Sequence, residues 1–76
     1  MSNRDPQREG ATLRTLRELR GFKPDQFASL AGISRPYLAN MEAGRKPIND
    51  IHLARFAELL NVEQIAIMRS SIEAAA

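Results

Sequence analysis

The sequence predicts an all-α domain of five short helices, and three of its features support this fold class. Apolar residues recur at intervals of three or four, as on one face of a helix, and they do not alternate long enough to form strands. Glycine and proline interrupt the pattern at short intervals, so each expected helix is brief. With 76 residues and no cysteine, the chain has the length of one domain and no disulfide framework.

The first two expected helices have recognisable ends. The first runs from about residue 11 to residue 20, with Leu13, Leu16 and Leu19 on one side, and Gly21 suits the left-handed cap that follows it. The second begins at Pro24, where the missing N–H of proline costs no hydrogen bond, and it ends at Gly32.

The third helix follows a short turn of sequence Ala-Gly-Ile-Ser. Ser34 is a strong N-cap because its hydroxyl can accept a hydrogen bond from the N–H of Tyr37, so the helix starts at Arg35 and ends near Gly44. Two helices joined by such a glycine turn make a helix-turn-helix. We therefore expect the second and third helices to form this motif.

The remaining helices lie in the C-terminal half. Asn49 or Asp50 can cap a fourth helix that reaches about Leu60 and stops at Asn61, and a fifth helix starts near Glu63. The expected organisation is a polar N-terminal arm at residues 1–9, a helical domain at 10–69 and a C-terminal tail at 70–76.

The third helix has two different faces. At about 100° per residue, Leu38 and Met41 point to the core, whereas small or polar side chains lie opposite them. Arginine and asparagine can form paired hydrogen bonds with guanine and adenine in the major groove, and alanine and proline can contact a thymine methyl group. This face predicts base recognition, with a merely solvated surface as the alternative. The candidate base-contacting residues are Arg35, Pro36, Ala39 and Asn40.

Positive charge is concentrated in the part of the chain that holds this motif. Residues 10–48 include seven arginines and lysines and three acidic residues, a net charge of +4, whereas residues 49–76 have a net charge of −2. Such an asymmetry favours a polyanionic partner that docks on the first part.

Several short motifs stand at a characteristic spacing, and with them the chain from Leu13 to about Met68 resembles the lambda-repressor-like helix-turn-helix family of the Cro and repressor (XRE) type. The motifs are Leu13-Arg14 and Leu16-Arg17 before Gly21, then Phe27-Ala28, Gly32-Ile33-Ser34, Leu38, Met41-Glu42 and Gly44. The resemblance implies a transcription regulator that binds double-stranded DNA as a dimer on an inverted-repeat operator. A small Cro-like repressor or controller protein fits this length, and an antitoxin-like protein-interaction module is the alternative.

The resemblance also implies roles around the third helix, which becomes the recognition helix. Arg17 and Glu42 match an ion pair between the first and third helices, with an exposed and weak pair as the alternative reading. The basic loop after the recognition helix lies on the DNA backbone in the family, which points to Arg45 and Lys46.

The start of the second helix departs from the family pattern. Relatives usually place a serine or threonine cap and then a glutamine there, whereas this chain has Lys23 and Pro24. Lys23 can replace the glutamine-to-phosphate contact as a point charge, and Gln26 can reach back to cap the helix. Tyr37 suits the core and a phosphate contact equally. The candidate phosphate-contacting residues are Lys23, Gln26, Tyr37, Arg45, Lys46 and Arg14.

A symmetric dimer is expected to form through the C-terminal part. The fifth helix and its surroundings hold more apolar side chains than so short a helix needs for packing on one core. The candidate interface residues are Leu59, Ile65, Ile67, Met68 and Ile72.

No enzymatic activity, cofactor or metal site is expected. The sequence has no glycine-rich phosphate loop and none of the common hydrolase or metalloprotease motifs, and His52 is its sole histidine. No run approaches the roughly 18 apolar residues of a membrane span, and residues 1–9 do not form a secretory signal. We therefore expect a cytoplasmic protein with no membrane or small-molecule partner.

Overall fold

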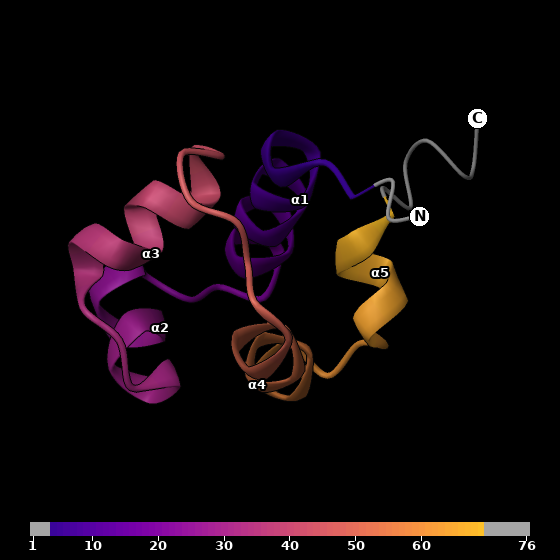
Figure 1. Ribbon diagram of the computed structural model, residues 1–76. Helices are drawn as coiled ribbons and strands as arrows, with labels where there is room; N and C mark the ends of the chain where they lie inside the picture. The colour runs from indigo at the N-terminus through magenta and orange to yellow at the C-terminus, as the bar shows by residue number, and fades with distance from the viewer. Residues whose placement is uncertain (1–3, 70–76) are drawn as a thin grey trace.

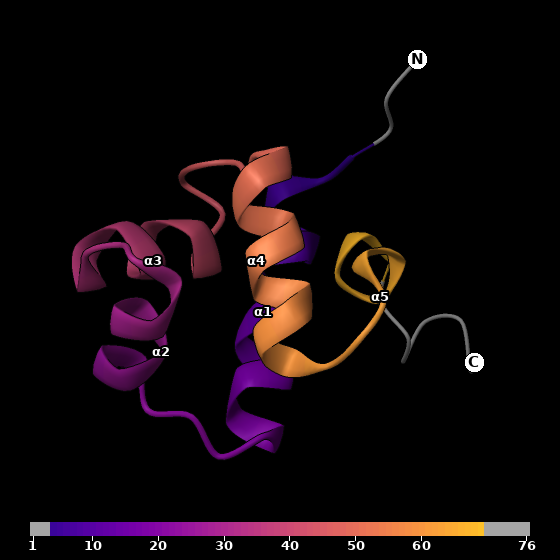
Figure 2. The same ribbon diagram turned by 90° about the horizontal axis from the view of Figure 1, so that it is seen from below.

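The computed structural model describes residues 4–69, which form five α-helices and no strand. Figure 1 shows α2 and α3 together on one side, α5 on the opposite side, and α1 and α4 between them. Figure 2, turned by 90°, shows the same order. The predicted all-α class with five short helices is confirmed. The helices are α1 (Pro6–Leu19), α2 (Pro24–Ala31), α3 (Arg35–Glu42), α4 (Asp50–Leu60) and α5 (Gln64–Met68).

Helix α1 begins five residues earlier than expected. The side chain of Asp5 accepts hydrogen bonds from the backbone N–H groups of Gln7 and Arg8, at 3.0 and 3.3 Å, and Pro6 occupies the first helical position. Residues 6–9 therefore belong to the helix and not to the expected polar arm. The local signal was a capping aspartate followed by proline, but no apolar periodicity extends before Leu13 to accompany it.

The other helix ends follow the local chemistry of the sequence. The hydroxyl of Ser34 accepts a hydrogen bond from the N–H of Tyr37 at 3.2 Å, as predicted. Of the two candidate caps for α4, Asn49 is the one that accepts a hydrogen bond, from the N–H of His52 at 2.8 Å. Gly32 and Asn61 end α2 and α4 in the left-handed conformation, with φ of 73° and 57°.

The core is built from large side chains of all five helices. Leu13, Phe27, Leu38, Phe56 and Ile67 are each almost completely buried. The rings of Phe27 and Phe56 stack with their centroids 5.5 Å apart, which joins α2 to α4. None of the helices among residues 4–69 has the length and apolar character to cross a bilayer.

Two glycines let α1 and the end of α3 approach closely. A Cβ atom on Gly10 would collide with the carbonyl oxygens of Met41 and Glu42. Gly44 has a φ of 79°, and a Cβ there would lie 2.7 Å from the Cα of Gln7. The first half of α1 is therefore a close support for the C-terminal end of α3.

Candidate nucleic-acid interface

Helix α3 has the two faces that its sequence predicts. Leu38 and Met41 are buried in the core. On the opposite side, Arg35, Pro36 and Ala39 are exposed, and Asn40 is half-buried. The helix therefore presents a surface of small side chains between one long cation at its start and one amide near its end.

Each polar side chain of this face has a protein partner on a neighbouring segment. Nη1 of Arg35 lies 3.3 Å from Oδ1 of Asp25 on α2. Nε of Arg45 donates a hydrogen bond to Oδ1 of Asn40 at 3.0 Å. The carbonyl of Asn40 also accepts hydrogen bonds from the N–H groups of Arg45 and Lys46, at 2.9 and 3.2 Å. The basic loop therefore closes directly on the end of the candidate base-contacting face.

The start of α2 has the geometry proposed for its unusual sequence. Oε1 of Gln26 accepts a hydrogen bond from the N–H of Lys23 at 3.4 Å, so the side chain reaches back over the helix start. Both residues are exposed, as are Arg45 and Lys46. Four candidate phosphate-contacting residues therefore lie at the solvent-facing ends of the helix-turn-helix.

Tyr37 takes an intermediate position between its two candidate roles. It is half-buried, and its ring lies edge-on to His52 of α4, with centroids 5.3 Å apart. The ring of His52 in turn stacks on Phe56 at 6.1 Å. Tyr37 therefore belongs to a column of rings that ties α3 to α4.

The expected ion pair between Arg17 and Glu42 is present and buried. Nε of Arg17 lies 2.7 Å from Oε2 of Glu42 and Nη2 lies 3.3 Å from Oε1, so the contact is bidentate. Nη1 of Arg17 donates to the carbonyl of Phe22 at 2.7 Å. The two side chains are only 6% and 10% exposed, which rules out the exposed and weak alternative.

Arg14 is exposed on α1 and forms an ion pair within its own helix. Its Nε lies 3.2 Å from Oε2 of Glu18, one turn further on. Both partners of this pair therefore belong to α1.

A second buried carboxylate, that of Glu9, was not predicted from the sequence. Nε and Nη2 of Arg4 contact its two oxygens at 2.8 and 2.7 Å, and the Glu9 side chain is 2% exposed. Nη2 of Arg4 also donates to the carbonyl of Ile48 at 3.0 Å, and Nη1 lies 3.3 Å from Oδ1 of Asp50. Hydrogen bonding to Glu9 raises the pKa of Arg4 above its ordinary value.

This cluster fastens the start of α1 to the segment that follows the basic loop. Helical spacing could have revealed it, because Glu9 precedes Leu13 by four residues and Arg17 follows Leu13 by four. The three residues therefore lie on one side of α1, and all three are buried.

The residues proposed for the dimer interface are not all at the surface. Ile65 is 52% exposed, and Leu59 and Met68 are half-buried against the core. Ile67 has no exposed surface, so its assignment to the interface is wrong. Helix α5 packs on α1 and α4 and turns this side chain inward. Ile72 lies outside the described residues.

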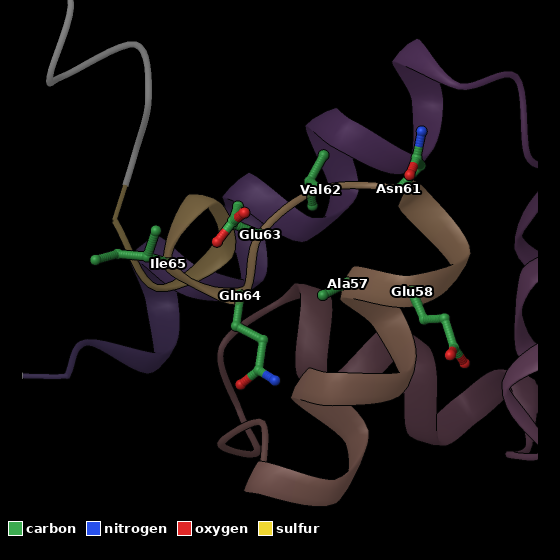
Figure 3. A pocket seen from close by; sticks show the side chains of 7 residues that line it. All are labelled: Ala57, Glu58, Asn61, Val62, Glu63, Gln64 and Ile65. Atoms are coloured by element: carbon green, nitrogen blue, oxygen red, sulfur yellow. The ribbon is translucent and has the colours of Figure 1, made fainter.

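A hollow of about 700 Å³ lies where α4 ends and α5 begins. Figure 3 shows its side chains around the connecting segment. Its lining includes exposed Ile65 and the carboxylates of Glu58 and Glu63, so the hollow has apolar and acidic parts. The lining residues are Ala57, Glu58, Asn61, Val62, Glu63, Gln64 and Ile65.

Comparison with known proteins agrees with this architecture. The helix-turn-helix domain family matches residues 10–67. A protein of Thermococcus kodakarensis described as an HTH-type transcriptional regulatory protein is 35% identical over 68 residues, which are 86% of this chain and 21% of the relative. The chain thus spans about a fifth of that relative's length.

Two solved structures cover nearly the whole fold. The restriction-modification controller protein C.AhdI from Aeromonas hydrophila has a TM-score of 0.78 at 27% identity, over 83% of this chain and 96% of that one. The clp gene regulator ClgR from Corynebacterium glutamicum has a TM-score of 0.82 at 25% identity, over 93% and 92% of the two chains.

Proposed function

The chain belongs to the helix-turn-helix domain family of the Cro and repressor (XRE) type, and from this premise we propose that it regulates transcription by binding double-stranded DNA. The observation that carries the proposal is the outer face of α3. Its exposed side chains match the chemistry of base edges, while Leu38 and Met41 fix the opposite side of the helix in the core.

In this proposal α3 enters the major groove and reads bases. Arg35 donates to guanine, Asn40 pairs with adenine, and Pro36 and Ala39 contact thymine methyl groups or allow close approach. Asn40 can do so while Arg45 donates to it, because its Oδ1 has a second lone pair and its amino group remains a donor.

The phosphate backbone is held on both sides of the groove. Lys23 and Gln26 lie at the start of α2, where the helix dipole also favours an anion. Arg45 and Lys46 lie on the loop after α3, and Tyr37 and Arg14 are further candidates. These contacts set the orientation of the domain on the duplex, and the base contacts supply its sequence preference.

We propose further that the protein acts as a symmetric dimer on an inverted repeat, with half-sites about 34 Å apart, as a Cro-like repressor or controller protein. The surface around Ile65, Leu59 and Met68, with the adjoining hollow, supports this assignment. Ile67 takes no part, because it is a core residue.

The test is binding to duplex DNA over a range of salt concentrations, with sequences selected from a random library as the specific target. A DNA-binding regulator should enrich a defined sequence, and the logarithm of its affinity should fall linearly with the logarithm of salt concentration. An antitoxin-like module that works only through a protein partner would show neither the enrichment nor the salt slope.

A further inference from the structure

Arg35, the first residue of the candidate base-contacting face on α3, forms an ion pair with Asp25 on α2. Asp25 lies in the first turn of α2, and its Oδ1 is 3.3 Å from Nη1 of Arg35, the first residue of α3. Both side chains are mostly exposed, at 75% and 63%. The pair therefore lies on the surface and not within the core.

We propose that Asp25 is a positioning residue that determines specificity by orienting Arg35 for its base. This inference rests on the proposed function, since it assumes that Arg35 reads DNA. Asp25 itself makes no favourable contact with the duplex and acts through the arginine.

The first reason is preorganisation. An arginine side chain has many rotamers, and fixing one on binding costs entropy. The carboxylate occupies only one edge of the guanidinium, because the contact is through Nη1. The remaining N–H groups stay available to donate to O6 and N7 of guanine.

The Asp25 carboxylate also lies on a helix end that is anchored in the core. Pro24 sets the first turn of α2, and the hydrogen bond from the N–H of Lys23 to Gln26 closes the helix start. Phe27, two residues after Asp25, is fully buried. Asp25 therefore projects from a helix end anchored in the core, which gives Arg35 a fixed reference point.

The second reason is charge. A carboxylate beside the base-contacting face repels phosphates in every register on DNA. Only the sequence in which Arg35 finds its base offsets this repulsion, so Asp25 opposes unspecific complexes more than the specific one.

Asp25 differs in its exposure from Glu9 and Glu42, the carboxylates that bind Arg4 and Arg17. The side chains of Glu9 and Glu42 are nearly buried and join helices of the core. An exposed pair such as Asp25 and Arg35 contributes little to stability. Its removal should therefore leave the fold unchanged, which separates a recognition role from a structural one.

The experiment compares the wild type with Asp25→Asn by selection from random duplex DNA and by titration of the selected and unrelated sequences. Arg35→Ala identifies the base pair that Arg35 reads. At that pair, Asp25→Asn should lower discrimination about two- to tenfold, as expected when one side chain loses its preorganisation. Affinity for unrelated DNA should rise, and Asp25→Glu should retain the preference.

Glu18→Gln is the matched control. It removes the same charge from an exposed carboxylate of α1 that pairs with an exposed arginine, Arg14. Its Oε2 also lies 4.0 Å from Nη2 of the buried Arg17, whose closer partner is Glu42. Glu18→Gln should change affinity for all sequences alike. Thermal unfolding of both variants should match that of the wild type, which confirms that the comparison is made between folded proteins.

Equal effects of Asp25→Asn and Glu18→Gln on selected and unrelated DNA would overturn the inference, because net charge would then explain them. The inference would also be overturned if Asp25→Asn lowered discrimination at that base pair by the same factor in the Arg35→Ala background, where Arg35 is absent. A wild type that enriches no sequence would instead overturn the proposed function, and this inference with it.

Discussion

Several arginines of the chain bind backbone carbonyl groups. Arg17, Arg20 and Arg55 donate to backbone carbonyls of Phe22, Leu60 and Ala31, at 2.7, 2.9 and 3.4 Å. Leu60 and Ala31 are the last residues of α4 and α2, whose carbonyls lack partners within the helix. Arg20 and Arg55 therefore satisfy helix ends, and Arg17 satisfies a carbonyl of the loop between α1 and α2. Part of the positive charge of the chain thus has a structural use.

The proposed base-contacting residues are tested by truncation. Arg35→Ala or Asn40→Ala should cost about 1 to 3 kcal/mol on the selected sequence, because each removes a paired hydrogen bond to one base. Fluorescence anisotropy titrations at fixed salt measure this cost. Each variant should lose preference at one base pair only, and unchanged affinity together with unchanged preference in both would contradict base reading by α3.

Lys46 tests the phosphate contacts. Lys46→Ala should weaken binding to all sequences by a similar factor and reduce the salt slope by about one unit, since one counterion fewer is released. Lys46 is a cleaner choice than Arg45, whose side chain also holds Asn40. A loss confined to the selected sequence would show that Lys46 does not contact phosphate alone.

Among the elements, α1 supports α3. It meets the end of α3 through Gly10 and through the buried pair of Arg17 and Glu42. Arg4, just before α1, binds Glu9 of α1 and the carbonyl of Ile48, which follows the basic loop. These contacts fix both ends of the segment from Met41 to Ile48, which includes the basic loop. The loop can then present its cations in one position.

The buried pair gives a prediction for stability. Glu42→Ala should lower the free energy of unfolding by about 3 to 5 kcal/mol, because it removes the bidentate partner of the buried Arg17 guanidinium. The remaining carboxylate, that of Glu18, lies 4.0 Å from Nη2. A domain of this length has a total stability of only about 4 to 11 kcal/mol, so the variant should lose a large fraction of it. Circular dichroism during urea titration measures the change.

Asp25→Ala is the control for this prediction, since its pair with Arg35 is exposed. Glu18 would not serve, because its Oε2 also lies 4.0 Å from Nη2 of the buried Arg17. Asp25→Ala should cost at most about 1 kcal/mol. Equal costs for Glu42→Ala and Asp25→Ala would mean that burial of the pair adds nothing to stability.

At the scale of the whole molecule, the helix-turn-helix and the hollow beside α5 lie on two different surfaces. The helix-turn-helix lies on one side and the hollow beside α5 lies on the other, with α1 and α4 between them (Figures 1 and 2). A second copy bound near α5 would therefore leave α3 free. This arrangement is what binding of two half-sites by a symmetric dimer requires.

Ile65 tests the dimer. Ile65→Glu should weaken assembly of two copies on an inverted repeat while the monomer stays folded, because the side chain is 52% exposed. Stoichiometry on DNA by analytical ultracentrifugation measures the effect. Leu19→Glu is the control. It introduces the same charge at an exposed apolar residue of α1, away from α5 in sequence, and should leave assembly unchanged.

Substitution of Ile67 would not serve this purpose. Ile67→Glu places a charge in the core and should unfold the domain, whatever the oligomeric state.

A complex of two copies that is unaffected by Ile65→Glu would contradict an interface at this surface.

The sequence by itself determined the helices from α2 onward and the outer face of α3. Helix ends depend on contacts between residues close in the chain, such as Ser34 with Tyr37 and Asn49 with His52. The faces of α3 follow from helical periodicity, so Leu38 could be assigned to the core and Arg35 to the surface.

Only the tertiary structure decided the features that depend on distant parts of the chain. Helix α5 has five residues, too few for periodicity to tell buried Ile67 from exposed Ile65, and packing on α1 and α4 made that distinction. The contact of Asp25 with Arg35 and that of Arg4 with the carbonyl of Ile48 likewise depend on the folded path. Residues far apart in sequence meet only after the core has packed, so no local pattern specifies which charged side chain finds which partner.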